Sequence, residues 1–464
     1  MSDQPVSTAD NGPLRKAARE LIGPFGDLLH APRALWGINL SYILEGLTYF
    51  GVVGLLAIFF NSTIGLDDID AGRMVGFLTA GITIAMLILG ATVDVVGPRK
   101  ALLVSLSLML VGRVLLTLSP EAGPPGLWSS AHLVAMAGLL GIILGYGIYQ
   151  PACYAAVKLF ADERAAAMGY AMLYALMNLG GFLPGLVSPP IRKAFGITGV
   201  FWVYVALTVV GIVVVAVFLT RRATERAIAR AGSGRSAARA PAAETPSRME
   251  RVRTYVRNFP LRDTRFLAFI FLLIPVQTLF AHNWLTLPQY CNRAFEGIVS
   301  ENFEFFVNVS PLLIFVLTPL VAAMTIGRNT YSMMIWGTFI MAAPTFLLVL
   351  GPNIWTLFAY LLIMTVGEAI WSPRFLQWIA EVAPPNMTGI YMGLGQFPWF
   401  LTKVITSLYS GWFLMRYCPE GVPPSAMNTE MMWFIHGMIA ITTPVALLLV
   451  RGWMVKGFKT RHGD

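Results

Sequence analysis

Three titratable side chains stand inside long apolar stretches of the sequence, where they could bind protons or pair with other charges. They are Glu45, His282 and Glu368. Ionisable groups are costly in hydrocarbon, so those that occur there usually face a water-filled interior and take part in function. We therefore predict that Glu45, Glu368 and His282 exchange protons. The alternative is a structural role, in which each side chain only bonds a neighbouring helix.

Glu45 belongs to a polar stripe on an otherwise apolar helix. At about 100° per residue, Ser41, Tyr42, Thr48 and Tyr49 all fall within about 60° of Glu45. Lipid cannot satisfy these polar groups, so the stripe is predicted to face water inside the protein. Tyr42 and Tyr49 are therefore candidate substrate-binding residues.

Three cations also lie deep in apolar stretches, namely Arg113, Arg374 and Lys403. They could simply neutralise Glu45 and Glu368, or they could hold an anionic group of a ligand, and both readings stay open. We include Arg113 and Arg374 among the predicted substrate-binding residues. Two more side chains could line the same interior, Gln277 and Trp371.

The composition indicates that membrane-spanning helices position these side chains. Hydrophobic residues make up 56% of the 464 residues, charged residues only 12%, and the mean hydropathy is +0.67. Apolar stretches of about 20 residues recur along the chain, each long enough to cross a hydrocarbon core of about 30 Å. We predict an all-α membrane protein, not a soluble one. Its twelve predicted spans are 34–60, 74–94, 100–118, 131–159, 165–190, 199–219, 265–290, 303–325, 331–350, 354–381, 387–415 and 429–453.

The formal net charge of +9 is distributed as in membrane proteins with a basic inner face. Most of the excess lies in one hydrophilic segment and near both termini, which predicts that both termini are cytoplasmic. This distribution argues against nucleic-acid binding. Residues 1–33 do not resemble a cleavable signal and contain an amphipathic stretch, so the first span should act as an uncleaved insertion signal. We expect an integral protein of a bacterial inner membrane.

The chain divides into two similar halves. Gly145-Tyr-Gly-Ile-Tyr-Gln-Pro151 in the fourth span matches Gly367-Glu-Ala-Ile-Trp-Ser-Pro373 in the tenth at one constant offset. Parallel repeats of this kind occur in transporters whose substrate site lies between the halves. We therefore predict two six-helix bundles. The predicted segments are a cytoplasmic N-terminal segment 1–33, an N-terminal bundle 34–219, a cytoplasmic linker 220–264, a C-terminal bundle 265–453 and a cytoplasmic tail 454–464.

No motif for catalysis or for a cofactor stands out in the sequence. We find no hydrolase triad, nucleotide-binding loop, haem motif or metal-ligand cluster, and the three cysteines lack metal-ligand spacing. We expect neither enzyme activity nor a cofactor or metal. Cys291 and Cys418 fall in predicted outer loops, where a disulfide between them stays open.

A short loop between the second and third spans carries glycines, an acid and a basic pair. Residues 90–100 resemble the signature of the major facilitator superfamily, and the alternative is an ordinary inside loop with basic residues. The glycines should allow a tight turn, and the acid should pair with helix ends as the halves move. The predicted gating residues are Gly90, Asp94, Gly97, Arg99 and Lys100.

A closer resemblance is to the proton-dependent oligopeptide transporter family. Residues 45–51, 112–118 and 367–373 look like parts of that family's first, third and tenth spans. Tyr174 and Asn178 stand where the family has a tyrosine and an asparagine in its fifth span. The resemblance implies a proton-coupled carrier and places these two side chains at its substrate site.

Three positions depart from that family's pattern. Tyr42 stands where the family carries its first glutamate, Gly46 where it carries an arginine, and Gln150 where it carries a lysine. The missing cations would hold the carboxylate of a peptide, so dipeptide uptake does not follow from the resemblance. Gln150 is retained as a candidate substrate-binding residue.

These features predict a secondary active transporter with the major facilitator fold that works by alternating access. We expect proton-coupled transport of a small organic solute, peptide-like by resemblance, by a functional monomer in the lipid bilayer. The alternative is a proton-antiport exporter of amphipathic compounds or drugs. A receptor or scaffold without transport is a third class, but carboxylates inside a membrane are costly to keep without a use.

Overall fold

The computed structural model describes residues 32–90, 92–160, 163–235, 263–325, 328–382, 391, 394–395 and 397–457. The amphipathic stretch predicted near the N-terminus lies outside the described residues, as does most of the predicted linker. All regular secondary structure in these ranges is helical.

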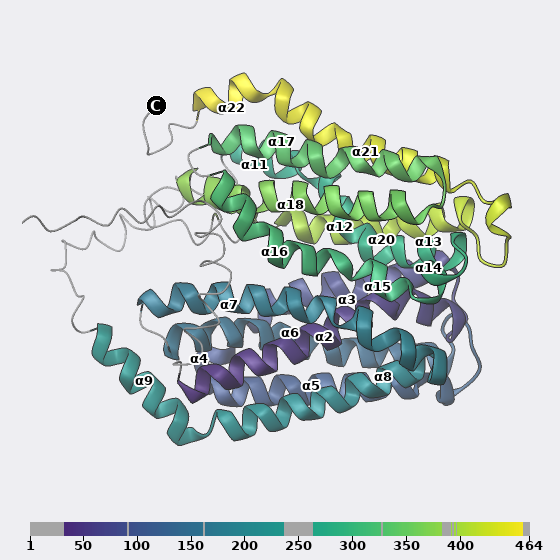
Figure 1. Ribbon diagram of the computed structural model, residues 1–464. Helices are drawn as coiled ribbons and strands as arrows, with labels where there is room; N and C mark the ends of the chain where they lie inside the picture. The colour runs from purple at the N-terminus through teal and green to yellow at the C-terminus, as the bar shows by residue number, and fades with distance from the viewer. Residues whose placement is uncertain are drawn as a thin grey trace, which may run out of the picture.

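Six long helices form the N-terminal bundle, which lies in the lower half of Figure 1. They are α2 (Arg33–Ser62), α3 (Asp68–Leu89), α5 (Pro98–Leu118), α6 (Ser130–Phe160), α7 (Glu163–Phe182) and α8 (Pro184–Phe218). A short helix, α4 (Thr92–Val96), stands between α3 and α5. The start of the predicted linker is also helical. This helix, α9 (Arg221–Arg235), follows α8 and packs against α6.

The C-terminal bundle lies above it in Figure 1 and contains more interruptions. Its seventh span is divided into α11 (Thr264–Leu272), α12 (Ile274–Leu285) and α13 (Leu287–Ala294). After the short α14 (Ile298–Glu301) come α15 (Phe303–Val307), α16 (Val309–Met324), α17 (Thr330–Ala342), the 3-10 helix η3 (Ala343–Leu350), α18 (Ile354–Val382), α20 (Phe397–Tyr417), α21 (Thr429–Leu449) and α22 (Arg451–Gly457).

Proline accounts for several of these interruptions. Pro275, Pro288 and Pro344 stand in the first turns of α12, α13 and η3, where the missing proline N–H is tolerated. The break between the fifth and sixth spans falls at Gly196, inside the predicted gap, and its φ of +69° suits glycine. A further helix start at Pro184, inside the predicted fifth span, was not predicted.

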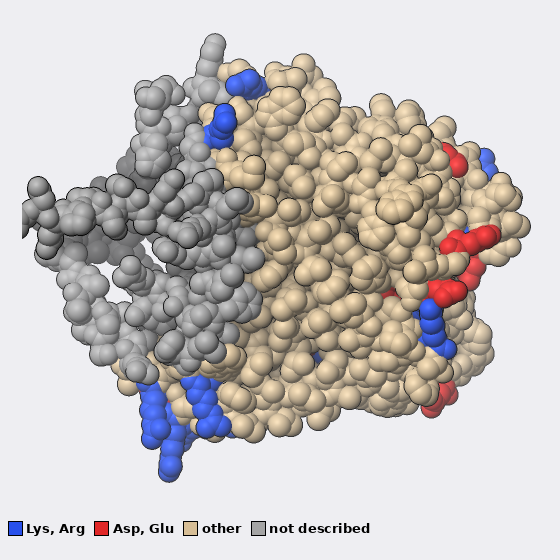
Figure 2. Space-filling model, viewed as in Figure 1, with Lys and Arg blue, Asp and Glu red and all other residues tan. Residues whose placement is uncertain are grey.

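The described helices are suited to a membrane. Nine helical segments among the described residues are long and apolar enough to cross one. One of them, Ala175–Phe218, covers the predicted fifth and sixth spans, and Phe303–Thr318 is a shorter apolar helix at the eighth. With α20 at the eleventh, each predicted span has a helical counterpart. On the face shown in Figure 2, charged side chains gather at the two ends of a broad uncharged belt.

The sequence repeat corresponds to a repeated packing contact. A Cβ on Gly145 of α6 would lie 2.6 Å from the carbonyl oxygen of Ser105 in α5. A Cβ on Gly367 of α18 would lie 2.7 Å from the carbonyl oxygen of Gly337 in α17. Glycine therefore permits the same close approach in each half, between the third and fourth spans and between the ninth and tenth.

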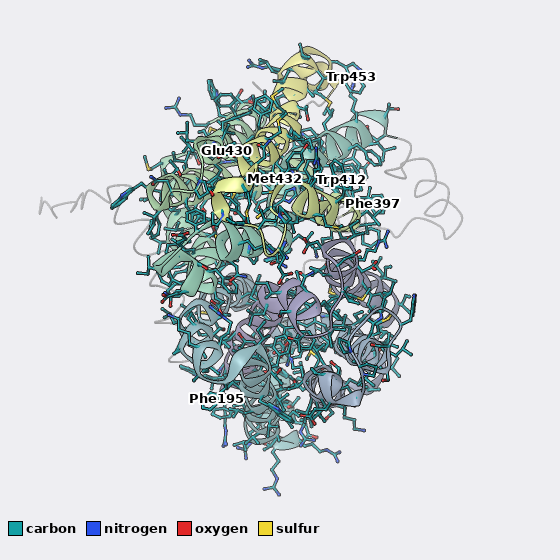
Figure 3. The ribbon with its side chains drawn as sticks, turned by 90° about the vertical axis from the view of Figure 1, so that its right-hand side faces the viewer. Phe195, Phe397, Trp412, Glu430, Met432 and Trp453 are labelled. Carbon is teal, nitrogen blue, oxygen red and sulfur yellow. The ribbon has the colours of Figure 1, made fainter. Side chains whose placement is uncertain are left out.

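The two bundles meet mainly along α3 with α20 and along α7 with α16. Figure 3 views them from the right-hand end of Figure 1, with Phe195 in one bundle and Trp412 in the other. A Cβ on Gly76 would lie 2.1 Å from Ser407 Oγ, and one on Gly411 would lie 2.2 Å from the carbonyl oxygen of Asp68. Small residues thus let α3 and α20 pack closely between the bundles.

Candidate functional site

An ion pair between Glu45 and Arg113 lies inside the N-terminal bundle. Each side chain is only 2% exposed. Arg113 Nη1 donates to Glu45 Oε2 at 3.0 Å, and Nη2 donates to Oε1, so the contact is bidentate. Arg113 Nη1 also donates to Thr208 Oγ1 at 2.6 Å, and Thr48 Oγ1 donates to Glu45 Oε2 at 3.1 Å. The cluster therefore connects α2, α5 and α8.

This geometry explains how a carboxylate can lie within an apolar helix. Two parallel hydrogen bonds from one guanidinium satisfy both oxygens of Glu45 and allow the two charges to be buried together. We expected Glu45 to face water, whereas the structure buries it against Arg113. In this conformation Arg113 neutralises the carboxylate of Glu45, which is one of the two roles that the sequence left open for Arg113. Proton exchange at Glu45 and ligand binding by Arg113 stay predictions.

Tyrosines pack beside this pair. Tyr49 contacts Tyr146 with ring centroids 4.8 Å apart, and Tyr42 stacks on Tyr149 at 6.1 Å. Tyr42 also lies next to the half-buried Gln150. Three of the predicted substrate-binding residues, Tyr42, Tyr49 and Gln150, thus lie near one another. The side chains of Tyr42 and Tyr49 are buried.

The C-terminal bundle contains a carboxylate and an ammonium group that do not pair with each other. Glu368 on α18 and Lys403 on α20 are both half-buried. Within the part of the chain that the structure describes, neither side chain has a hydrogen-bond or ion-pair partner. Glu368 therefore lies in a different environment from Glu45.

Trp371 and Gln277 lie within the C-terminal bundle. Trp371 is fully buried, stacks on Trp399 with centroids 6.4 Å apart, and donates from Nε1 to Met341 Sδ at 3.2 Å. Gln277 is also fully buried, and its Oε1 accepts from Thr402 Oγ1 at 3.5 Å. Among the described residues, Gln277 Nε2 has no hydrogen-bond partner.

His282 is buried among α12, α20 and α21. Its Nδ1 lies 2.7 Å from Thr286 Oγ1, and its Nε2 lies 3.0 Å from Tyr409 OH. The ring of His436 lies 4.0 Å away, centroid to centroid. His436 was not predicted, although a second histidine inside an apolar span was the available signal. Proton exchange by His282 stays a prediction.

Arg374 ties α18 to the end of α16. Its Nη2 donates to the carbonyl oxygen of Thr325 at 2.7 Å and to Thr325 Oγ1 at 3.0 Å. Asn178 is half-buried on α7 and makes interactions of its own. The side chain of Tyr174 lies outside the described residues, so its predicted role is not addressed by the geometry.

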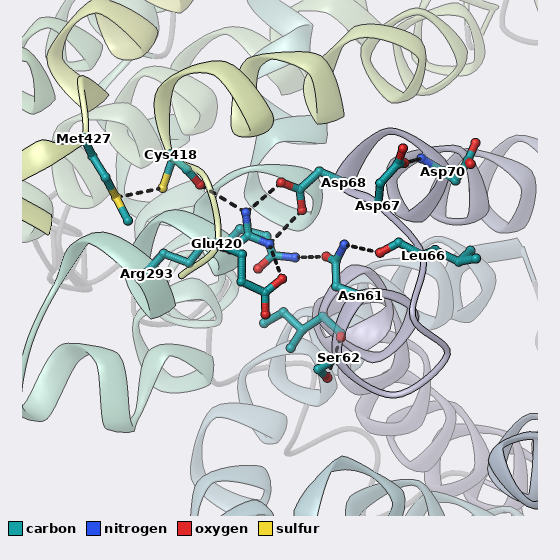
Figure 4. Close-up of polar contacts among 12 residues, drawn as sticks. Asn61, Ser62, Leu66, Asp67, Asp68, Asp70, Arg293, Cys418, Glu420 and Met427 are labelled. Atoms are coloured by element: carbon teal, nitrogen blue, oxygen red, sulfur yellow. Dashed lines mark hydrogen bonds and ion pairs between the residues drawn. The ribbon is translucent and has the colours of Figure 1, made fainter. Parts of the chain in front are cut away.

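Polar contacts join the two bundles at the end opposite α22 and the start of α2 (Figure 1 and Figure 4). Arg293 of α13 donates to both carboxylate oxygens of Asp68 at the start of α3, at 2.7 and 2.8 Å. Burial lowers the pKa of Arg293, but the hydrogen bonds and charge of Asp68 outweigh it and raise the pKa above its ordinary value. Gln289 Nε2 donates to Asn61 Oδ1 at 2.5 Å beside this pair.

A second set of ion pairs lies at the same end. Arg192 of α8 binds both carboxylate oxygens of Glu304 in α15, with Nη2 to Oε2 at 3.1 Å. Lys193 Nζ lies 3.0 Å from Glu301 Oε2. These pairs were not predicted. The available signal was a set of opposite charges at the outer ends of the predicted spans.

Cys291 and Cys418 are buried near this end as free thiols. Cys418 Sγ contacts Met427 Sδ at 3.7 Å, and the Cys418 carbonyl oxygen accepts from Arg293 at 3.1 Å. The disulfide that was left open is therefore not formed in this structure.

A family model described as Major Facilitator Superfamily matches residues 38–407, which is most of the chain. The chain belongs to the major facilitator superfamily. It is accordingly an integral membrane transporter rather than an enzyme.

Two curated relatives of this major facilitator are similar along nearly their whole length. Dipeptide and tripeptide permease A of Proteus mirabilis (strain HI4320) is 22% identical over 483 residues, which cover 90% of this chain and 93% of the relative. The protein of the same name from Enterobacter sp. (strain 638) is 21% identical over 504 residues, which cover 96% of this chain and 95% of the relative.

Solved structures share the fold. A peptide transporter POT in complex with sulfate matches with a TM-score of 0.68 at 19% identity, covering 92% of this chain and 96% of that chain. A POT family transporter in complex with 5-aminolevulinic acid matches with a TM-score of 0.67 at 16% identity, covering 91% of this chain and 97% of that chain. The predicted resemblance to this group of facilitators is confirmed at the level of the fold.

The signature loop of this facilitator is partly described. Gly97 has a φ of +80°, which confirms a tight turn at that position. Gly90 instead caps the C-terminal end of α3 with αR backbone angles, and a Cβ there would lie 3.4 Å from Pro151 Cγ of α6, an ordinary contact distance. Arg99 is half-buried and Lys100 exposed, while the side chain of Asp94 lies outside the described residues.

Proposed function

We propose that this facilitator couples the movement of a small organic solute to a proton gradient by alternating access. The buried Glu45–Arg113 pair, within a fold shared with peptide transporters, carries this proposal. Relatives named dipeptide and tripeptide permeases favour a peptide-like solute. We further propose that the protein works as a monomer in a bacterial inner membrane.

A proton and Arg113 compete for the carboxylate of Glu45. When Glu45 is ionised, Arg113 binds it through two hydrogen bonds and also holds Thr208. A proton on Glu45 removes the charge that attracts the guanidinium, because a protonated carboxyl group is neutral. Protonation therefore loosens the connection among α2, α5 and α8. In this way a proton changes the packing of one bundle, which must move relative to the other.

The ion pairs between the bundles act as one gate in this scheme. Asp68–Arg293 and Arg192–Glu304 link the bundles at the end opposite α22 and the start of α2, so opening there requires both pairs to break. With both termini cytoplasmic, as the basic segments predict, this gate faces outward. The described conformation then corresponds to a carrier that is closed to the outside.

The test compares two activities of Glu45→Gln in proteoliposomes loaded with dialanine. Glutamine mimics the protonated carboxyl, so uphill uptake driven by an inward proton gradient should be lost. Exchange of labelled for unlabelled dialanine needs no net proton movement and should be largely retained. Wild-type accumulation by Glu45→Gln would show that Glu45 is structural.

Glu121→Gln is the matched control, because Glu121 is an exposed carboxylate of the same bundle. It should keep both accumulation and exchange. The direction of the gradient separates the proposed importer from a proton-antiport exporter. Uptake that an inward gradient accelerates supports import, whereas extrusion under that gradient supports export.

The predicted role of the signature loop gives a second experiment. We propose that Asp94 assists the movement of the bundles, so Asp94→Ala should insert normally into the membrane but slow both uptake and exchange. Lys100→Gln removes an exposed charge from the same loop and serves as a comparison. Normal rates in a well-expressed Asp94→Ala variant would contradict the gating role.

A further inference from the structure

An arginine joins the start of α2 to the end of α8. Arg33 is the first residue of α2, and its side chain is exposed. Its Nη2 donates to the carbonyl oxygen of Val217 at 3.3 Å, and its guanidinium carbon lies 5.4 Å from the ring centroid of Phe218. Arg33 has no ion-pair partner among the described residues. Its charge is therefore held at the end of the sixth span without being neutralised.

More arginines follow this contact in the sequence. Arg221 and Arg222 begin α9, three and four residues after Phe218, and Arg226 lies about one turn farther along. All three side chains are exposed. Within the described part of the chain, only Arg221 of these three has an ion-pair partner. That partner is Glu225 at 3.0 Å, and the two side chains are themselves 90% and 62% exposed.

These arginines gather where α8 meets α9. We call Arg33, Arg221, Arg222 and Arg226 the arginine corner. In Figure 1, α9 turns away from α8 and crosses the end of the N-terminal bundle, where it packs against α6 and α2. Figure 2 shows Lys and Arg side chains gathered at the same place. Four guanidinium groups and the carboxylate of Glu225 leave three net positive charges there.

The stability of α9 does not explain these positions. The helix dipole disfavours cations in the first turn, yet Arg221 and Arg222 stand there and no acidic residue does. Arg222 and Arg226 are four residues apart, a spacing at which like charges on a helix repel each other. The opposite face attaches α9 to the bundle, since Ala227 is only 3% exposed. An anionic partner would offset the repulsion among these arginines.

An apolar stripe on α8 leads to the arginine corner. Val210, Val213 and Val217 are 47%, 53% and 45% exposed, and at about 100° per residue they fall within about 60° of one another. On a helix that spans the membrane, such a stripe contacts the acyl chains of lipids. The stripe ends at Val217, whose carbonyl oxygen binds Arg33. Lipids beside the stripe therefore have their headgroups at the level of the arginine corner.

We propose that the arginine corner binds the headgroup of an anionic phospholipid, whose acyl chains lie along the valine stripe of α8. Guanidinium groups bind phosphate oxygens through paired hydrogen bonds. Clusters of basic residues directly after a membrane span are suited to bind anionic lipids. With both termini cytoplasmic, as the basic segments predict, the lipid belongs to the cytoplasmic leaflet. This site lies on the outside of the N-terminal bundle, separate from the groups proposed for proton coupling.

The test is native mass spectrometry of the purified full-length protein, titrated with phosphatidylglycerol or with phosphatidylcholine of the same acyl chains. The wild type should bind phosphatidylglycerol more tightly. Each arginine near a membrane surface contributes roughly a fivefold factor in affinity for an anionic lipid. Arg222→Gln combined with Arg226→Gln should therefore bind phosphatidylglycerol roughly 25-fold more weakly and leave the binding of phosphatidylcholine unchanged.

Two further double variants make the assignment specific. Arg222→Lys with Arg226→Lys keeps both charges and should keep the preference for phosphatidylglycerol. Arg73→Gln with Arg416→Gln removes two exposed arginines from the opposite end of the molecule and should bind lipid like the wild type. An unchanged preference in the variant with glutamine at 222 and 226 would overturn the proposal. So would an equal loss in the control, because net charge rather than the corner would then decide binding.

A soluble anion separates a lipid site from a general phosphate site. Glycerol 3-phosphate carries the phosphate but has no acyl chains to contact the valine stripe. At a concentration equal to that of phosphatidylglycerol, it should displace little of the bound lipid. Full displacement would assign the arginine corner to soluble phosphate compounds and overturn the lipid assignment. None of these measurements depends on uptake, so the result is independent of the outcome for proton coupling.

Discussion

Each bundle places a carboxylate and a cation deep within its spans, but the two bundles differ in how these charges are satisfied. In the N-terminal bundle, Glu45 and Arg113 are each 2% exposed and bind each other in a bidentate contact. In the C-terminal bundle, Glu368 and Lys403 are half-buried and have no partner in the described part of the chain. A satisfied buried pair ties helices together, whereas unsatisfied charges are suited to bind a ligand. The first pair should therefore affect stability and the second should affect binding.

The largest expected effect is the loss of Arg113. Arg113→Met leaves the carboxylate of Glu45 buried without its cation, which should lower the free energy of unfolding by about 3–5 kcal/mol. Chemical denaturation in mixed micelles measures this change. The double variant Glu45→Gln with Arg113→Met should recover much of the loss, because it leaves no buried charge. A single variant as stable as the wild type would show that the pair does not hold the bundle.

A smaller effect is expected at Thr208, which accepts a hydrogen bond from Arg113 at 2.6 Å. Thr208→Val keeps the shape of the side chain and removes the acceptor, so the unfolding free energy should fall by about 1.5–3 kcal/mol. Thr442→Val on the exposed side of α21 makes the same chemical change and should shift it by less than about 0.5 kcal/mol. Equal effects at the two positions would argue against a cooperative cluster around Arg113.

The smallest effect on stability is expected in the C-terminal bundle. Glu368→Gln and Lys403→Gln each remove a charge that no group among the described residues satisfies, so each should change the unfolding free energy by less than about 1 kcal/mol. Denaturation under the same conditions as for Arg113→Met provides the measurement. A loss of about 3 kcal/mol or more would reveal a partner for these charges and erase the contrast between the bundles.

The sequence predicts the fold well because hydropathy and spacing are local properties of each span. The matching glycines show this, since Gly145 and Gly367 occupy equivalent helix contacts in the two halves. The sequence also places charges deep in the spans. It does not show which charges pair, because Glu45 and Arg113 meet only through the packing of α2 against α5 and α8. Arg113 and Lys403 looked alike in sequence, and only the three-dimensional arrangement distinguishes them.

The contacts between the bundles could not have been predicted from the sequence for a related reason. Asp68 and Arg293 stand at the ends of spans in different halves of the chain. Hydropathy places both on the same side of the membrane, together with several other charged residues. Which of them approach each other depends on the conformation of the carrier, and a linear pattern contains no information about it.

The balance of charges within the spans has an electrical consequence. Glu45 with Arg113 and Glu368 with Lys403 contribute two formal charges of each sign, whereas Arg374 lies farther towards the end of its span, where it binds Thr325 just past the end of α16. Moving one elementary charge through a membrane potential of about 100 mV changes the free energy by about 2.3 kcal/mol. An empty carrier in which these charges cancel can change orientation with little electrical work, whereas a carrier with one additional proton moves one net charge. Membrane voltage should therefore act mainly on the proton-loaded transition, and the return of the empty carrier should be nearly independent of it.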